Sequence, residues 1–262
     1  MTPGITQLVL PLPTIDFLSA ARNAGYQTAE LAMLREGDLT LDTSQADLRA
    51  YADHADKIGI ELVSMCQLQC TGNLLTSGDQ QKISLDQTIA GLKAAKSMGI
   101  TCTLHTLGRL DPDLYYDDAY NNAVQSLQTL APVCEQLGVD IALEFVWNGF
   151  LFSPMEYKRL LDDVASPRIG FYHDPGNMAV FQYPHHWVRI LGNHIKMVHL
   201  KDWKGGPLNG QWTALLEGEI DFVVHNKELR AAGYDGPMIS EVDTDLATIE
   251  ATCKAIQKII TM

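Results

Sequence analysis

Acidic and basic residues follow several apolar segments of the chain, at positions where a buried strand would end. The segments "IALEFVW", "GFYHDPGN", "IKMVHLKDW" and "MISEVD" carry in this way Glu144, Asp174, His199 and Glu241. Charged groups are rarely buried without partners, because burying an unpaired charge costs several kcal/mol. Three carboxylates and one imidazole brought together without balancing arginines would need a cation between them. We therefore predict that these four residues bind one divalent metal ion.

The types of these four residues also indicate which metal they would bind. Mostly oxygen ligands with a single histidine favour a hard or borderline ion in octahedral geometry. Mn2+ is the favoured ion, with Mg2+ and Co2+ as alternatives, whereas structural zinc fits less well because no cysteine takes part. Taken singly, a carboxylate at a strand end is more often a helix N-cap or a surface charge. The prediction depends on four such residues at equivalent points of consecutive strands.

Further polar and aromatic side chains near the same strand ends are candidates for substrate contacts. Lys201 shares a strand face with His199 and is either an ion-pair partner or a substrate contact. His173 lies on the opposite strand face from Asp174, so we expect it to face the helices or to support the site. Indole rings suit the apolar face of a sugar, with lid packing as the alternative, and three tryptophans follow strand ends: Trp147, Trp203 and Trp212. The predicted substrate contacts are His105, Trp147, Asn177, Lys201 and Trp203.

A short recurring pattern shows which elements would position these residues. Phrases such as "KIGIELVSM" and "QLGVDIALE" place a glycine after a helical pattern and before an apolar run, as at a helix end that leads into a strand. Amphipathic patterns typical of helices fill the intervals, and Ser84 and either Thr43 or Ser44 are expected helix N-caps. The expected strands span residues 5–10, 26–33, 60–68, 100–107, 139–146, 168–174, 195–202 and 237–243.

Strands that alternate with helices predict a parallel α/β fold. No segment looks like a linker, so we expect residues 1–262 to form a single domain. Eight strand–helix units in about 250 residues predict a (β/α)8 TIM barrel, with its active site at the C-terminal strand ends. An open doubly wound sheet is the alternative, but no GxGxxG loop follows the first expected strand.

The strand expected at 195–202 shows how the barrel would present its polar residues. Side chains alternate between the two faces of a strand, so one set would point into the barrel: Ile195, Met197, His199 and Lys201. Val198 and Leu200 would then pack against the helices. The metal ligand and the lysine would therefore lie at the mouth of the barrel, above its apolar interior.

Composition limits the partners of this 262-residue chain. Hydrophobic residues make up 46% of it and charged residues 19%, which is enough apolar material for a large core. A formal net charge of -13 disfavours phosphate backbones and anionic membranes, so neither nucleic acid nor a membrane is an expected partner. Five scattered cysteines, the absence of a basic, apolar leader pattern and the absence of a long apolar run predict a cytoplasmic protein.

The strand ends resemble the sugar phosphate isomerase/epimerase family of xylose isomerase-like TIM barrels. The likeness extends over nearly the whole chain and is most specific in "ALEF", "YHDPGN", "VHLKD", "LLEGEIDF" and "GPMISEVD". That family includes ketose 3-epimerases, hydroxypyruvate isomerase, inosose dehydratase and abasic-site endonucleases. The resemblance implies that the metal is held by Glu144, Asp174, His199 and Glu241.

The chain also departs from parts of this family. Free-ketose 3-epimerases tend to carry a glutamate, a histidine and an arginine where this chain has Phe150, Asn177 and Gly205. These departures speak against their strict pocket, although not against isomerase chemistry. The abasic-site endonucleases need an additional histidine ligand at the Asn177 position, and the charge of -13 also opposes a nuclease.

The predicted site suits reactions that begin by removing a proton next to a carbonyl. A metal that chelates a carbonyl and a hydroxyl oxygen stabilises an enediolate, and the resemblance implies that Glu144 and Glu241 exchange protons with it. Lys201 would stabilise the oxyanion or protonate a leaving hydroxyl. The sequence therefore predicts a metal-dependent isomerase or epimerase of a sugar or keto-sugar, mildly favouring an unphosphorylated one.

Two other functions remain open at this point. The first is a lyase with the same metal site, which would dehydrate an inosose-like or 3-keto-sugar substrate. The second is a carbohydrate-binding barrel without catalysis, which the intact Glu144 and Glu241 oppose. The aromatic residues after the strands also favour a homo-oligomer, a dimer or a tetramer.

Overall fold

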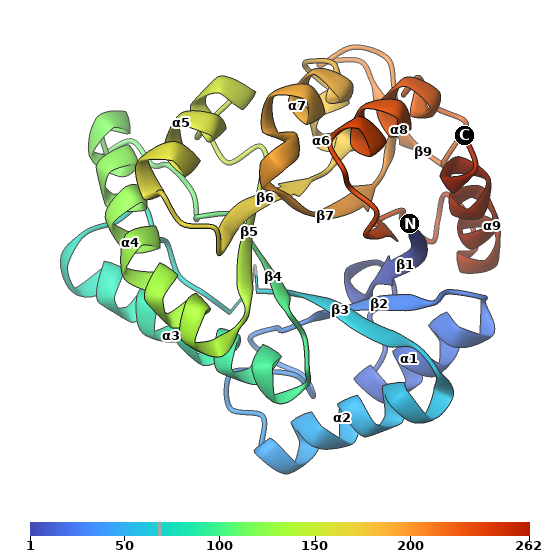
Figure 1. Cartoon of the computed structure of the whole chain (residues 1–262), viewed down its shortest axis with the longest axis horizontal. Helices are drawn as coiled ribbons and strands as arrows, with labels where there is room; N and C mark the ends of the chain where they lie inside the picture. Colours follow the sequence, from blue (N-terminus) through green and yellow to red (C-terminus); the bar gives the residue numbers. More distant parts are fainter. Residues whose placement is uncertain (68–69) are drawn as a thin grey trace.

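The computed structural model of the chain describes residues 1–67 and 70–262. At its centre lies a closed barrel of parallel strands, hydrogen-bonded in the order β1-β10-β7-β6-β5-β4-β3-β2. The helices surround these strands, so that each barrel strand is covered from outside (Figure 1). The predicted TIM-barrel fold is therefore confirmed.

The elements alternate along the chain much as the sequence predicts. The barrel strands are β1 (Thr2–Thr6), β2 (Thr28–Ala32), β3 (Glu61–Cys66), β4 (Cys102–His105), β5 (Asp140–Glu144), β6 (Ile169–His173), β7 (Ile195–Leu200) and β10 (Pro237–Ser240). The helices are α1 (Thr14–Asn23), α2 (Gln45–Ile58), α3 (Gly78–Ser97), α4 (Tyr116–Leu137), α5 (Pro154–Val164), α6 (Pro175–Ala179), α7 (Pro184–Leu191), α8 (Phe222–Ala231) and α9 (Ile249–Ile260). Two 3-10 turns, η1 (Gln7–Val9) and η2 (Gly192–His194), and a small hairpin of β8 (Asp202–Lys204) and β9 (Gln211–Thr213) complete them. The expected third strand runs to residue 68, which lies outside the described residues.

Local signals explain where some helices begin and end. The side chain of Ser44 caps α2 by accepting a hydrogen bond from the Asp47 amide, and Gly59 ends this helix with a φ of 72°. The expected cap at Ser84 is wrong, because α3 begins at Gly78 and extends through this position. Ser84 is fully buried within the helix, where its hydroxyl donates to the carbonyl of Gln80.

The first strand lies earlier than the sequence predicts. The sequence predicts residues 5–10, whereas β1 spans Thr2–Thr6 and the chain then turns into η1. The Thr6 side chain caps this turn, and the amide of the Gln7 side chain donates to the carbonyl of Leu12. These polar contacts pull the apolar segment after Thr6 out of the strand and fold it over the barrel mouth.

The core has two parts, one inside the barrel and one between strands and helices. The inner cluster contains Val63, Cys66, Cys102, Leu104, Ala142, Tyr172, Met197 and Ile239. Met197 points inward, and Val198 and Leu200 pack in the outer cluster, as predicted. The prediction for Ile195 is wrong, because Ile195 packs against the outer cluster. A register shift places Ile195 beside Phe171 and Met197 beside Tyr172. The strand therefore contains one extra residue between Ile195 and Met197, and the two side chains lie on opposite faces.

The cysteines and the helices bear on the predicted environment of the protein. All five cysteines are buried and none forms a disulfide: Cys66, Cys70, Cys102, Cys134 and Cys253. Within residues 1–67 and 70–262, no helix combines the length and the apolar character that crossing a membrane requires.

Candidate metal centre

Four side chains from neighbouring barrel strands meet at one end of the barrel. Each of Glu144, Asp174, His199 and Glu241 offers a ligand atom, and these atoms all lie within 4.8 Å of one another. They come from β5, β6, β7 and β10 or from the residue that follows the strand, and these strands are neighbours in the barrel. The four residues predicted as metal ligands therefore form a group that can hold a metal ion.

Asp174 is fixed by the start of the helix that follows it. Its Oδ1 atom accepts hydrogen bonds from the amides of Gly176 at 2.8 Å and Asn177 at 3.2 Å, which makes Asp174 the N-cap of α6. Its Oδ2 atom is buried without a hydrogen bond, and Lys201 Nζ lies 3.0 Å from it as an ion-pair partner. A buried carboxylate oxygen that accepts no hydrogen bond and lies beside three other ligand groups is one that a bound cation would satisfy.

The imidazole of His199 lies between carboxylates on both of its nitrogen atoms. Its Nδ1 atom is 2.9 Å from Glu241 Oε2 and 3.3 Å from Glu144 Oε1. Its Nε2 atom is 3.0 Å from Oε1 of Glu30 on β2. Since metal-binding histidines commonly donate their other N–H to a carboxylate, Glu30 would leave Nδ1 free to bind an ion.

Glu30 was missed by the sequence analysis. It is fully buried inside the barrel, where its second oxygen accepts short hydrogen bonds of 2.6 Å from Ser64 Oγ and Tyr172 OH. The available signal was the segment "YQTAELAM", in which one glutamate is the single charged residue of the strand. The argument applied to His199 holds for it too, because a charge within a buried strand needs partners.

The electrostatics of the group favour a cation. Burial raises the pKa of Glu144 above its usual value, whereas Lys201 and His199 outweigh burial and hold that of Glu241 low. Burial would lower the pKa of His199, but the carboxylates of Glu30 and Glu241 raise it well above its ordinary value. The carboxylate excess that stabilises protonated His199 is the same field that would stabilise a divalent ion.

Lys201 and Asn177 connect the carboxylates at the mouth of the centre. Lys201 Nζ lies 2.8 Å from Glu241 Oε2. Burial would lower the pKa of Lys201, but the carboxylates of Asp174 and Glu241 outweigh it and raise this pKa. The same ammonium group donates to Asn177 Oδ1 at 3.4 Å. Asn177 Nδ2 in turn donates to the carbonyl of Phe145 at 3.1 Å and to Glu144 Oε1 at 3.4 Å. Both predicted contact residues therefore lie beside the metal centre.

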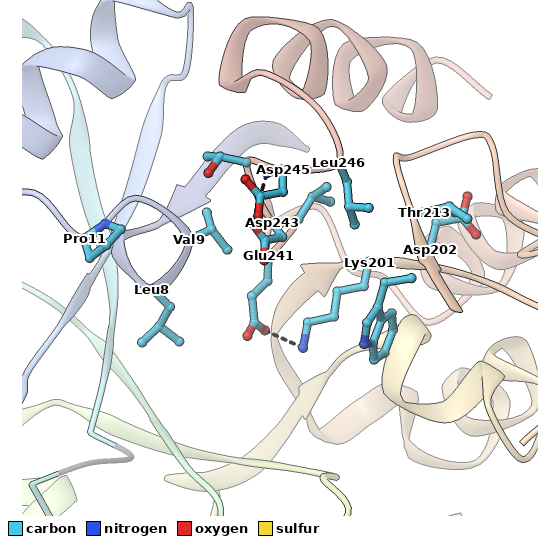
Figure 2. A pocket seen from close by; sticks show the side chains of 13 residues that line it. Leu8, Val9, Pro11, Lys201, Asp202, Thr213, Glu241, Asp243, Asp245 and Leu246 are labelled. Atoms are coloured by element: carbon cyan, nitrogen blue, oxygen red, sulfur yellow. Dashed lines mark hydrogen bonds and ion pairs between the residues drawn. The ribbon is translucent and has the colours of Figure 1, made fainter. Parts of the chain in front are cut away.

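A cavity of about 690 Å³ opens above the centre (Figure 2). Figure 2 shows Glu241 and Lys201 pointing toward one another in it, with Leu8 and Val9 on the opposite side. Its lining comes mainly from the loops after β1, β7 and β10: Leu8, Val9, Pro11, Lys201, Asp202, Trp212, Thr213, Glu241, Val242, Asp243, Thr244, Asp245 and Leu246. The cavity therefore gives a substrate access to Glu241 and Lys201.

Three of the four tryptophans, Trp147, Trp203 and Trp212, form one cluster beside this cavity. The rings of Trp147 and Trp212 are stacked with centroids 5.6 Å apart, and Trp203 packs edge-on against Trp212 at 4.8 Å. Trp147 donates its indole N–H to the carbonyl of Asn177. Trp203 is buried, donates to the carbonyl of Gly205 and does not contribute to the cavity lining. Trp212 therefore lines the cavity, whereas Trp203, which the sequence predicts as a substrate contact, does not.

Two further histidines lie on the outward faces of their strands. His173 Nε2 is 3.0 Å from His225 Nε2 on α8, as expected for a residue that faces the helices. His105 shares its strand face with Thr103, opposite to Cys102 and Leu104 of the inner cluster. Its Nδ1 atom accepts from the Leu107 amide, and burial lowers its pKa to about 4. The structure therefore does not bring His105 to the metal centre.

The sequence profile of the xylose isomerase-like TIM barrel family matches residues 18–259. The chain belongs to this family. Among curated relatives, it is 23% identical over 255 residues to the L-ribulose-5-phosphate 3-epimerase UlaE of Escherichia coli strain SMS-3-5, covering 93% of this chain and 88% of UlaE.

Solved structures share the fold of the chain at low sequence identity. A D-tagatose 3-epimerase-like protein superimposes with a TM-score of 0.85 at 20% identity, covering 100% of this chain and 97% of that one. The 3-keto-D-glucoside 4-epimerase YcjR from Escherichia coli gives 0.81 at 14% identity, with 100% of both chains covered. Membership in this family, which includes relatives named as sugar epimerases, agrees with a group of side chains that can hold a metal ion.

Proposed function

We propose that the protein is a divalent-metal-dependent isomerase or epimerase that acts on a sugar or keto-sugar through an enediolate. One observation carries this proposal. The carboxylates of Glu144 and Glu241 come from β5 and from the end of β10, yet both approach His199 Nδ1, at 3.3 and 2.9 Å. Two carboxylates that reach one point from separate strands suit proton removal and return on two sides of a substrate.

The residues of the chain divide the chemistry between them. A divalent ion held by Glu144, Asp174, His199 and Glu241 would supply Lewis acidity toward a carbonyl oxygen and its neighbouring hydroxyl. Glu144 and Glu241 exchange protons with the carbon next to the carbonyl. Return to the opposite face of the same carbon gives epimerisation, and return to the neighbouring carbon gives isomerisation. Asn177 orients Glu144 through the hydrogen bond of its Nδ2 atom.

Lys201 stabilises negative charge on the substrate oxygen. Its ammonium group lies at the mouth of the centre, and the neighbouring carboxylates keep it protonated by raising its pKa. A fixed cation placed where charge develops is a strong source of catalysis. The same proton could leave with a β-hydroxyl, which is the step that a dehydratase would need.

The proposal also names the metal ion, the domain organisation, the oligomeric state and the cellular compartment. We propose Mn2+ as the ion, because oxygen ligands with one histidine suit it. We also propose that residues 1–262 act as a single domain within a homo-oligomer in the cytoplasm. All five cysteines are buried and none forms a disulfide, which supports a reducing compartment.

Solvent isotope exchange tests the proposal. Metal-loaded protein is incubated in D2O with a panel of keto-sugars and followed by NMR. We expect deuterium at the carbon next to the carbonyl without loss of water, whereas an unsaturated product would indicate the lyase instead. Glu144→Gln and Glu241→Gln should each lower exchange by about 100-fold or more. Glu61→Gln, at the other end of the barrel, is the matched control. Unchanged turnover in both site variants would contradict the proton-transfer roles.

A further inference from the structure

The cavity above the metal centre has an unusual balance of charge. Among the described residues that line it, Lys201 is the one cation, against four carboxylates: Asp202, Glu241, Asp243 and Asp245. Lys201 is already paired with Asp174 and Glu241 at 3.0 and 2.8 Å. A negatively charged group of a substrate would therefore find no unpaired cation among these lining residues.

Phosphate groups in TIM barrels are commonly bound by backbone amides after the seventh and eighth strands. After β7, the carboxylate of Asp202 occupies such amides itself. Its two oxygens accept from the amides of Trp203, Leu216, Gly218 and Ile220, at 2.9, 2.9, 3.0 and 3.3 Å. Asp202 is buried, so this loop is closed around an internal carboxylate in place of an external anion.

The loop after β10 is closed in a similar way. Asp243 Oδ1 accepts from the amide of Asp245 at 3.0 Å, and the carbonyl of Asp243 accepts from Leu246 at 3.0 Å. At the start of α9, Thr248 Oγ1 accepts from the Ala251 amide. The amides of Asp245, Leu246 and Ala251, which could bind a phosphate here, are therefore used by the chain, and the carboxylates of Asp243 and Asp245 lie in the same loop.

We propose that the substrate is uncharged at the end that lies in this cavity: a free keto-sugar or a neutral keto-glycoside, not a sugar phosphate. This inference rests on the proposed function and narrows its substrate. The rest of the cavity suits such a ligand. Leu8, Val9 and Pro11 form an apolar side, and Trp212 offers a ring beside the lysine. The exposed carboxylates of Asp243 and Asp245 can accept hydrogen bonds from sugar hydroxyls while they repel a phosphate.

Matched pairs of substrates test the inference. D-fructose is compared with D-fructose 6-phosphate, and L-ribulose with L-ribulose 5-phosphate, using the Mn2+-loaded protein in D2O. Binding of the same compounds is followed in parallel by tryptophan fluorescence, which needs no turnover. We expect the neutral member to exchange its proton with a kcat/KM about 100-fold higher, because like charges brought together are strongly disfavoured.

The possible results separate this inference from the function itself. Faster exchange of the phosphorylated member would overturn the inference and leave the proposed function standing. If neither member of either pair exchanges a proton or quenches the fluorescence, the proposed function fails and takes the inference with it. Binding without any exchange in both pairs would also overturn the function, and with it the inference.

A variant of the cavity wall gives an independent test. Asp243→Asn keeps an oxygen that can accept from the Asp245 amide but removes the charge. It should reduce the preference for the neutral member by about fivefold, as expected for one partly exposed charge. Asp86→Asn makes the same change on α3, at an exposed residue outside the cavity lining, and should leave the preference unchanged. Equal preference ratios in Asp243→Asn and the wild type would overturn the assignment of this wall.

Discussion

The inner floor and the outer wall of the site are built on different principles. The floor consists of Glu30, Ser64, Tyr172 and His199, all of them fully or almost fully buried and joined by hydrogen bonds of 2.6 to 3.0 Å. The wall consists of loop residues around the cavity, where Asp243 and Asp245 are exposed to solvent. The floor holds the imidazole of His199 in a fixed orientation, whereas the wall presents negative charge to a ligand.

This difference separates two functions that are often treated as one. Buried, fully partnered groups tolerate little change, so the floor fixes how His199 meets an ion. Exposed loop carboxylates can change without disturbing the barrel, so the wall can set the substrate. We therefore expect changes in the floor to alter metal affinity and changes in the wall to alter KM or substrate preference.

Lys201 lies where the floor and the wall meet, and its replacement should have the largest effect. Lys201→Met keeps the length of the side chain and removes its charge. We expect kcat to fall by about 100-fold, because a fixed cation no longer stabilises the oxyanion, while Mn2+ binds at least as tightly. Steady-state kinetics and calorimetric Mn2+ titration measure the two quantities. A weaker affinity for Mn2+ with an unchanged kcat would place Lys201 in the floor instead.

Glu30→Gln should produce the next largest effect. The amide can no longer accept the His199 N–H with a charged oxygen, so we expect Mn2+ affinity to fall by about 10- to 100-fold. Calorimetric titration of the metal-stripped protein measures this change. Ser64→Ala is the milder comparison, since it removes one hydrogen bond to the other oxygen of Glu30. Full Mn2+ affinity in Glu30→Gln would contradict the role of the floor.

Trp212→Ala tests the wall with a smaller change. Loss of the ring that stacks on Trp147 should raise KM for a keto-sugar by about 3- to 10-fold and leave Mn2+ affinity unchanged. Trp212→Phe retains an aromatic face and should keep most of the affinity for the substrate. If KM is the same in wild type and Trp212→Ala, this ring does not contact the substrate.

His105 lies on the outward face of the barrel, away from both the floor and the wall. We therefore expect its replacement to change only the free energy of unfolding of the protein. Burial lowers the pKa of His105 to about 4, so the unfolded chain binds its proton first as the pH falls below about 6.5. His105 therefore contributes stability above that pH which is lost on acidification toward pH 4.

His105→Asn removes this titration while keeping an oxygen that can accept from the Leu107 amide. Between pH 7.5 and 5, the variant should lose about 2 kcal/mol less free energy of unfolding than the wild type. Denaturant unfolding at the two pH values measures the difference. An equal loss in both proteins would show that His105 takes up its proton in the folded state.

Much of the barrel could be predicted because its signals are local. Alternation of strands with helices and polar residues at strand ends depend on short stretches of sequence, which is why the four ligand residues were found. Glu30 was missed because its partners are distant: Tyr172 and His199 follow it by 142 and 169 residues. The segment of residues 7–10 reads as a strand, but the hydrogen bond of Gln7 to Leu12 turns it aside. Ile195 faces outward because of a shift in register that periodicity does not show.

Titration of Mn2+ into the metal-stripped protein tests the central claim most directly. Asp174→Asn is the matched variant, because one side-chain oxygen can still cap α6 while an amide nitrogen replaces Oδ2, which accepts no hydrogen bond and pairs with Lys201. We predict one ion bound per wild-type chain and a loss of about 100-fold or more in affinity in Asp174→Asn. Equal Mn2+ binding by both proteins, or no binding by the wild type, would contradict the assignment of the metal centre.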